Sequence, residues 1–225
     1  GSLTVAKGTE ISAQTEGTRK GGDINISTKE TTLNITADGQ ISASTSGAGQ
    51  GGNINLKATE TIDITGDGEI SVKTTGAGNA GNISIETPNL TTDQIKITAS
   101  TEAEGKGGSI RAETETLNLD NNSQLTVETN GSGAAGDIEI QTGSLTVAKG
   151  TEISAQTEGT GKGGDINISP KETTLNITGN GEISASTSGA GQGGNIDISA
   201  PETIDITGDG KISVETKDVG QAGNI

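Results

Sequence analysis

The ten residues TEISAQTEGT at positions 9–18 return letter for letter at positions 151–160. The match extends well beyond them, because residues 143–225 differ from residues 1–83 at only 15 positions. We interpret residues 1–142 as one module and residues 143–225 as a partial second copy of it. Copying a module lengthens a repetitive structure, which serves a fibre and is rarely needed by a catalyst.

A shorter period is present within each module. A Gly followed by Asp, Asn or Ser and then Ile recurs eight times, at spacings of 27 to 30 residues, so that the module of residues 1–142 holds five units. The glycines of this motif are Gly22, Gly52, Gly81, Gly108, Gly136, Gly164, Gly194 and Gly223. The low share of hydrophobic residues (27%) and the 37 glycines would by themselves favour disorder. A regular period is instead typical of a solenoid.

Each unit contains three short segments in which apolar and polar residues alternate. In the first unit they are LTV at 3–5, ISA at 11–13 and INI at 24–26, with a Gly-rich loop before the third. Alternation with a period of two predicts a β-strand with one buried face. Asp-Gly and Asn-Gly pairs in the first turn equally suggest antiparallel hairpins. An odd number of hairpinned strands would reverse every second unit, however, so three strands per unit favour parallel stacking.

Two further observations favour a parallel solenoid. One Thr occupies the same slot in all eight units, as expected where like residues stack on like. Its members are Thr15, Thr45, Thr74, Thr101, Thr129, Thr157, Thr187 and Thr216. The motif Gly always lies seven positions after this Thr, whereas the next unit's first Leu or Ile lies nine to eleven positions after that Gly, so insertions lie at one corner. We predict an all-β parallel β-helix (β-solenoid) over residues 1–225, with about eight coils of 27–30 residues and three short strands per coil.

The predicted core is aliphatic, because the chain has no Phe, Trp or Tyr. A narrow interior that repeats about every 4.8 Å favours branched aliphatic side chains of matched size. In the first coil the core residues are Leu3, Val5, Ile11, Ala13, Ile24 and Ile26. The fourth unit has one residue fewer around Gln94, Ile95 and Lys96, where we expect a register adjustment.

The composition excludes several classes of function. Without His or Cys, the chain cannot form a Ser-His, Cys-His or His-metal site. Carboxylate pairs remain available, as in polysaccharide-cleaving β-helices, some of which need calcium and a catalytic Arg. Only Arg19 and Arg111 could supply that Arg, and Arg19 becomes Gly161 in the second copy. Because a catalytic site would interrupt the repeat with unique residues, we expect no enzyme, no catalytic residue and no cofactor.

The charge balance bears on partners. With 14 Lys and Arg against 30 Asp and Glu, the net charge is -16, which disfavours nucleic acid and anionic lipid. No apolar run approaches the roughly 20 residues that cross a bilayer, so we expect no membrane insertion. The absence of Met, even at the start, suggests a segment of a longer protein.

Two surface patterns admit a binding interpretation. Stretches such as GKGGDINIS resemble Gly-rich calcium repeats, and Asp137 beneath Asp165, with Glu139 alongside, is the best candidate for such a site. Those repeats need tandem nonapeptides, however, so we predict a hydrogen-bonded side-chain ladder at the strand entrance and no metal site.

A column of Ser and Thr is predicted to face outward, where hydroxyls could match ice or a crystalline glycan. Its members are Ser12, Ser42, Ser71, Thr98, Thr126, Ser154, Ser184 and Ser213. The neighbouring column mixes Gln14, Ser44, Lys73 and Ser100, so an ordinary solvated β-face is the favoured interpretation.

Units such as DGQISASTSGAGQGGNINL and GEISASTSGAGQGGNIDIS resemble the repeats of filamentous haemagglutinin-like proteins, the exported partners of two-partner secretion systems in Gram-negative bacteria, especially cyanobacterial members. The resemblance covers all eight units. It implies a right-handed parallel β-helix in a long extracellular or cell-surface fibre that is secreted through an outer-membrane pore and commonly serves in adhesion.

We therefore expect a structural or adhesive segment of a bacterial fibre, a rod whose partners are neighbouring coils and a host-cell or glycan receptor. End-to-end self-association through open strand edges is a further expectation. The alternatives are a carbohydrate-binding or carbohydrate-cleaving β-helix with a groove along one outer face, and an ice-binding solenoid.

Overall fold

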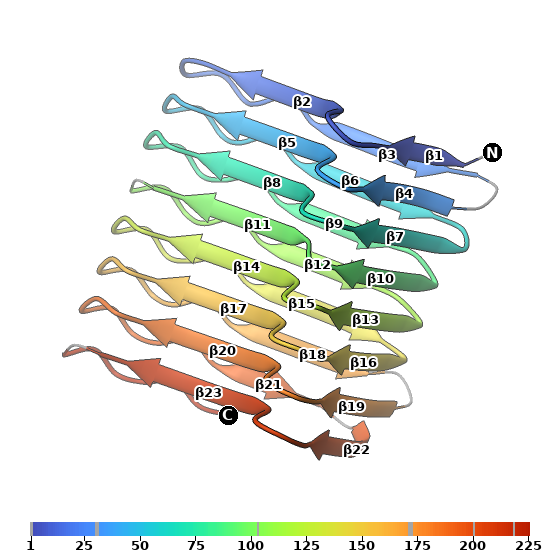
Figure 1. The fold of residues 1–225 in the computed structure, drawn as a ribbon. Coiled ribbons are helices and arrows are strands. Elements are labelled where there is room, and N and C mark those ends of the chain that lie inside the picture. The colour runs from blue at the N-terminus through green and yellow to red at the C-terminus, as the bar shows by residue number, and fades with distance from the viewer. Residues whose placement is uncertain (1, 30–31, 103, 171–172, 200, 218) are drawn as a thin grey trace.

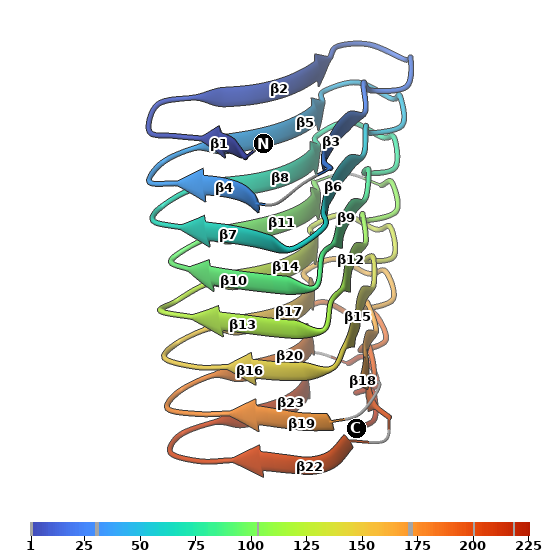
Figure 2. The ribbon, with the colours of Figure 1, turned by 90° about the vertical axis from the view of Figure 1, so that its right-hand side faces the viewer.

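The chain folds into a right-handed β-solenoid (Figure 1, Figure 2). The structure is a computed structural model that describes residues 2–29, 32–102, 104–170, 173–199, 201–217 and 219–225. Within these residues it contains strands and no helix. Three parallel sheets run along the rod, and each of the first seven coils contributes one strand to each sheet. The predicted fold class is therefore confirmed.

The three sheets hold the first, second and third strands of the coils, and we call them sheets A, B and C. Sheet A comprises β1 (Leu3–Val5), β4 (Thr32–Thr36), β7 (Thr61–Thr65), β10 (Asn89–Asp93), β13 (Thr116–Asp120), β16 (Ser144–Val147), β19 (Thr173–Ile177) and β22 (Pro201–Ile206). Sheet B comprises β2 (Glu10–Thr15), β5 (Gln40–Thr45), β8 (Glu69–Thr74), β11 (Lys96–Thr101), β14 (Gln124–Thr129), β17 (Glu152–Thr157), β20 (Glu182–Thr187) and β23 (Lys211–Thr216). Sheet C comprises β3 (Ile24–Thr28), β6 (Ile54–Ala58), β9 (Ile83–Glu86), β12 (Ile110–Glu113), β15 (Ile138–Thr142), β18 (Ile166–Pro170) and β21 (Ile196–Ile198).

Coils 1 to 7 each contain three strands, beginning with β1–β3, and coil 8 contains β22, β23 and the segment after them. The predicted stacking of like residues is confirmed, since Thr15 pairs with Thr45 in the register of β2 and β5, and the same column continues to Thr216. The corner between sheets C and A varies in length, as predicted. Residues 30–31, 171–172 and 200 of that corner lie outside the described residues.

The prediction of a register adjustment in the fourth coil is wrong. Strand β10 pairs in register with β7 through Asp93, and β11 pairs in register with β8 from Lys96. The shorter turn is absorbed between the strands, where Gln94 adopts a positive φ of 60° and Ile95 is 1% exposed. Residues with positive φ also occur in the longer equivalent turns, such as Ala37 with a φ of 57°, so the missing residue is taken up within the turn and neither sheet slips.

The core is a continuous aliphatic column between the sheets. The residues equivalent to its predicted members are buried in coils 2 to 6, where for example Leu33, Ile35 and Ile41 are 0% exposed. Ile198 of coil 7 is only partly buried, and Ile204 and Ile206 of coil 8 are exposed. In coil 1 Val5, Ile24 and Ile26 are buried, whereas Ile11 and Ala13 are only partly buried and Leu3 is exposed. Leu3 belongs to β1, and Ile11 and Ala13 belong to β2, the strands at the N-terminal end of the stack (Figure 1).

The Gly-rich loops between sheets B and C stack backbone on backbone. A β-carbon added to Gly49, Gly78 or Gly161 would lie 1.8–1.9 Å from the carbonyl oxygen of the loop in the preceding coil. Glycine is required here because any side chain would overlap that carbonyl group. The repeated Gly-x-Gly pattern of the loop therefore sets how closely the coils approach.

The Thr column of sheet B faces inward, which the sequence analysis did not predict. Its members from coil 2 to coil 7 are at most 1% exposed. Thr74 donates a hydrogen bond of 3.4 Å to the carbonyl oxygen of Asn79 in its own loop. Among the described residues, the Thr129 hydroxyl is buried without a hydrogen-bond partner. A buried hydroxyl without a partner carries a desolvation cost.

This contrast predicts opposite effects of one substitution at two buried threonines. Replacing Thr129 by Val should raise the free energy of unfolding by about 1 to 2 kcal/mol, because an unpaired buried hydroxyl is removed. The matched control is Thr142, where the hydroxyl accepts from Thr114 at 2.8 Å and donates to the Ser144 carbonyl at 3.0 Å. Thr142→Val should lower the free energy of unfolding by about 1 to 3 kcal/mol, because it removes both hydrogen bonds. Urea denaturation measures both, and equal effects would contradict the assignment.

Candidate functional site

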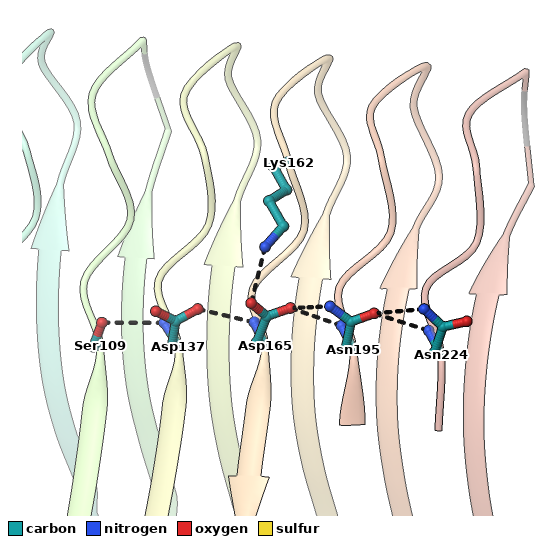
Figure 3. A network of polar contacts seen from close by, with 6 residues as sticks. All are labelled: Ser109, Asp137, Lys162, Asp165, Asn195 and Asn224. Atoms are coloured by element: carbon teal, nitrogen blue, oxygen red, sulfur yellow. Dashed lines mark hydrogen bonds and ion pairs between the residues drawn. The ribbon is translucent and has the colours of Figure 1, made fainter. Parts of the chain in front are cut away.

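A polar ladder runs along the rod where the Gly-rich loop enters sheet C. The side-chain oxygen of the residue after each motif Gly accepts a hydrogen bond from the backbone N–H of the equivalent residue in the next coil. Its distances lie between 2.8 and 3.1 Å. The members are Asp23, Asn53, Asn82, Ser109, Asp137, Asp165, Asn195 and Asn224. Figure 3 shows the part from Ser109 to Asn224.

The ladder confirms the prediction of hydrogen bonding at the strand entrance. Asp, Asn and Ser interchange in this column because each has a short side chain with an oxygen acceptor. Asp137 accepts the Asp165 amide at 2.9 Å, and Glu139 is 2.6 Å from the Arg111 guanidinium. Asp137 and Asp165 are thus linked in the ladder, whereas Glu139 belongs to a separate ion pair. No group of three acidic, His or Cys residues in the described part of the chain could hold a metal ion.

Two ladder carboxylates are also paired with lysines of their own loops. Lys20 lies 2.9 Å from Asp23, and Lys162 lies 2.9 Å from Asp165. The hydrogen bond from the Asn53 amide, with that from Lys20, lowers the pKa of Asp23. Burial raises the pKa of Asp165, but the hydrogen bonds from Lys162 and the Asn195 amide outweigh it, so this pKa is also lowered. Both residues therefore act as ionised acceptors that bind neighbouring coils together.

The predicted outward Ser and Thr column lies on sheet B, but it is not uniformly accessible. Ser42, Ser71 and Thr98 are half-buried, whereas Ser154 and Ser184 are 0% and 7% exposed, with their hydroxyl oxygens 3.3 Å apart. The prediction of a continuous exposed column is therefore wrong at these two residues. On β17 the Gln156 amide donates to the Glu152 carboxylate at 3.2 Å, and this pair flanks Ser154 on both sides along the outer face. Long side chains in the adjacent columns thus cover part of the hydroxyl array.

The outer face of sheet C carries an ion-pair cluster around Arg111. Its Nη1 lies 2.6 Å from Glu139, and its Nη2 lies 3.4 Å from Glu113 and 3.3 Å from Gln141. The hydrogen bond with Glu139 raises the pKa of Arg111. Arg111 is therefore held as a cation by its neighbours on successive coils, an arrangement that links β12 to β15.

A recess of about 330 Å³ lies at the corner between sheets C and A over coils 2 to 4. Its lining residues are Lys57, Ala58, Thr59, Glu86, Thr87, Pro88, Glu113, Thr114 and Glu115. Lys57 and Glu86 form an ion pair on its rim. The sequence analysis did not identify this recess. The three corners that line it each have two residues between their strands, so no difference in spacing marks them in the sequence.

Comparison of the chain with models of protein families, with curated proteins and with solved structures finds no match. No helix in the described residues is long and apolar enough to cross a membrane.

The lowered pKa values of Asp23 and Asp165 predict a loss of stability in acid. Because the fold favours the ionised carboxylates, their contribution is complete above the ordinary value of 3.8 and disappears as the pH falls through the lower folded-state pKa. The double variant Asp23→Asn, Asp165→Asn keeps an oxygen acceptor but removes both charges. Between neutral pH and about pH 3, its free energy of unfolding should fall less than that of the unchanged chain.

Urea denaturation followed by circular dichroism at each pH measures this difference. The other carboxylates titrate in both proteins, so their effect on charge repulsion cancels in the comparison. Identical acid dependence of the two proteins would show that the ladder carboxylates contribute nothing.

Proposed function

We propose that the chain is a structural or adhesive segment of an extracellular or cell-surface bacterial fibre, in which it forms a rod-like shaft. The observation that carries this proposal is the unbroken polar ladder, which links coil 1 to coil 8 through the same backbone-to-side-chain contact. A ladder that repeats from coil to coil transmits tension along the rod axis and marks no single coil as special.

The arrangement of the chain also supports a spacer. Eight coils stacked at the spacing of neighbouring strands give a rod of about 40 Å. Each further copy of the five-coil module would lengthen that rod without a new design, because every coil offers the same two edges. Module copying is therefore an economical route to a projecting shaft.

The outer surface supports a role outside the cell, where the rod meets other molecules. A net charge of -16 keeps such a rod soluble and opposes lateral aggregation. By its resemblance to filamentous haemagglutinin-like repeats, we infer that it is secreted through an outer-membrane pore protein and that it presents or contacts a host-cell or glycan receptor. We infer a non-catalytic role, with no cofactor.

Immunogold electron microscopy of the source cells, with antibodies raised to residues 1–225, tests the proposal. We expect gold particles distributed along fibres at the cell surface. Gold confined to the cell interior, or to secreted material without fibres, would contradict the shaft. Pre-immune serum and cells lacking the protein are the controls.

Carbohydrate binding in the recess at coils 2 to 4 is a second candidate function. Carboxylates of Glu86, Glu113 and Glu115, the Lys57 ammonium group and the Pro88 ring offer hydrogen-bonding groups and an apolar surface to a sugar. A glycan screen tests it. Binding that Glu115→Gln weakens and Glu128→Gln on sheet B leaves unchanged would support this site, whereas equal effects would exclude it.

A further inference from the structure

Coils 1 and 6 are nearly the same sequence in two different settings. Residues 1–28 and 143–170 differ only at Arg19, which corresponds to Gly161, and at Thr28, which corresponds to Pro170. Coil 6 is stacked on both sides, between β13–β15 and β19–β21. Coil 1 is stacked only on its C-terminal side in the structure (Figure 1). The Arg19 position can therefore be compared directly with an interior coil.

Arg19 interrupts a column of glycines that otherwise spans every coil. The column continues as Gly49, Gly78, Gly105, Gly133, Gly161, Gly191 and Gly220. A β-carbon on any of these seven would lie 1.8–1.9 Å from the carbonyl oxygen of the corresponding residue one coil earlier. The contact points one way only, from each glycine toward the coil on its N-terminal side. Arg19 does not hinder the stacking of coil 2, because it is the backbone carbonyl oxygen of Arg19 that lies against Gly49 of that coil.

We propose that Arg19 blocks the N-terminal face of coil 1 against any coil that carries the loop of this repeat, including coil 8 of a second copy of the chain. In coil 6 the equivalent Gly161 packs against the Gly133 carbonyl of coil 5. In the same geometry the β-carbon of Arg19 would overlap the carbonyl oxygen of the preceding coil. A change of side-chain rotamer could not remove this overlap, because the β-carbon is attached directly to the backbone and the oxygen is part of it.

The opposite end of the rod is open and apolar. In coil 8 Ile204 and Ile206 are 47% and 45% exposed, whereas their counterparts Ile62 and Ile64 in coil 3 are 0% exposed beneath the next coil. Leu3 on the N-terminal face is 38% exposed, against 1% for its counterpart Leu145. The C-terminal face of coil 8 and the N-terminal face of coil 1 carry the same apolar side chains that interior coils bury against one another, so a second copy of the chain matches these faces in shape.

The polar groups at the two ends are also complementary. In the register of sheet B, Lys211 of one copy would lie opposite Glu10 of the next, as it lies 3.4 Å from Glu182 within the chain. In the ladder, the side-chain oxygen of Asn224 would meet the amide of Asp23, as that of Asn195 meets the Asn224 amide at 3.0 Å. Over residues 1–27, Arg19 is the one position at which the sequence of coil 1 differs from that of coil 6.

Sedimentation velocity of three proteins over a range of concentrations tests this inference. The chain as it stands should sediment as a monomer at every concentration, in contrast to the end-to-end self-association expected from open strand edges alone. Arg19→Gly, which makes coil 1 identical to coil 6 through residue 27, should shift the boundary to dimers and longer species as the concentration rises. Arg19→Ala, which removes the charge and length of the side chain but keeps the β-carbon, should remain monomeric.

Further measurements separate end-to-end stacking from other association. Adding Ile204→Lys and Ile206→Lys to Arg19→Gly should restore the monomer, since both isoleucines lie on the proposed contact face, and circular dichroism should show the β-structure unchanged in each variant. Negative-stain images of Arg19→Gly should show longer rods of unchanged width. A monomeric Arg19→Gly protein, association of the unchanged chain, or equal association of Arg19→Ala and Arg19→Gly would each overturn the proposal. These outcomes test the role of Arg19 alone and do not depend on whether the chain is part of a cell-surface fibre.

Discussion

The close approach of one backbone loop to the next is the constraint on which the rest of the structure depends. At the corner between sheets B and C, a glycine α-carbon of each coil lies against a carbonyl group of the coil before it. The glycine positions of the loops leave no room for a β-carbon, so their stacking fixes the spacing and the rotational position of successive coils. The strands on both sides then meet in register, and neighbouring coils pair along all three sheets.

Because the strands of successive coils pair in register, residues of the same chemical type lie above one another in columns along the rod. Because Asp, Asn and Ser stand above one another at the entrance to sheet C, each side chain finds the same backbone amide one coil away. The aliphatic core follows the same logic, since Ile54 and Ile83 occupy equivalent positions and pair directly. A chain without aromatic residues can therefore be stable as a rod, by repeating a small set of matched contacts.

Much of this architecture could be predicted from the sequence, and the exceptions have physical reasons. The period of the Gly-[Asp, Asn or Ser]-Ile motif and the strand alternation predicted the coils, the parallel stacking and the polar ladder. The pattern of residue types could not show that the missing residue near Gln94 would be taken up within the turn while both flanking strands stay in register. It also could not show that Glu152 and Gln156 would flank Ser154 closely, because rotamers of long side chains depend on neighbours from other coils. The recess at Pro88 is lined by corners of equal length from three coils, and the pattern of residue types could not show that their side chains would leave a hollow.

The central claim is that glycine in the loop column is required by contact with the preceding coil and not by its own backbone dihedrals. The most direct measurement is the free energy of unfolding of Gly133→Ala, whose β-carbon would lie 1.9 Å from the Gly105 carbonyl oxygen, beside Ser132→Ala in the same loop. The account predicts that Gly133→Ala lowers it by about 1 to 3 kcal/mol, the usual cost of overpacking, and that Ser132→Ala leaves it nearly unchanged. Equal stability of the two variants would contradict the account, because the loops would then have room that the stacked coils do not allow.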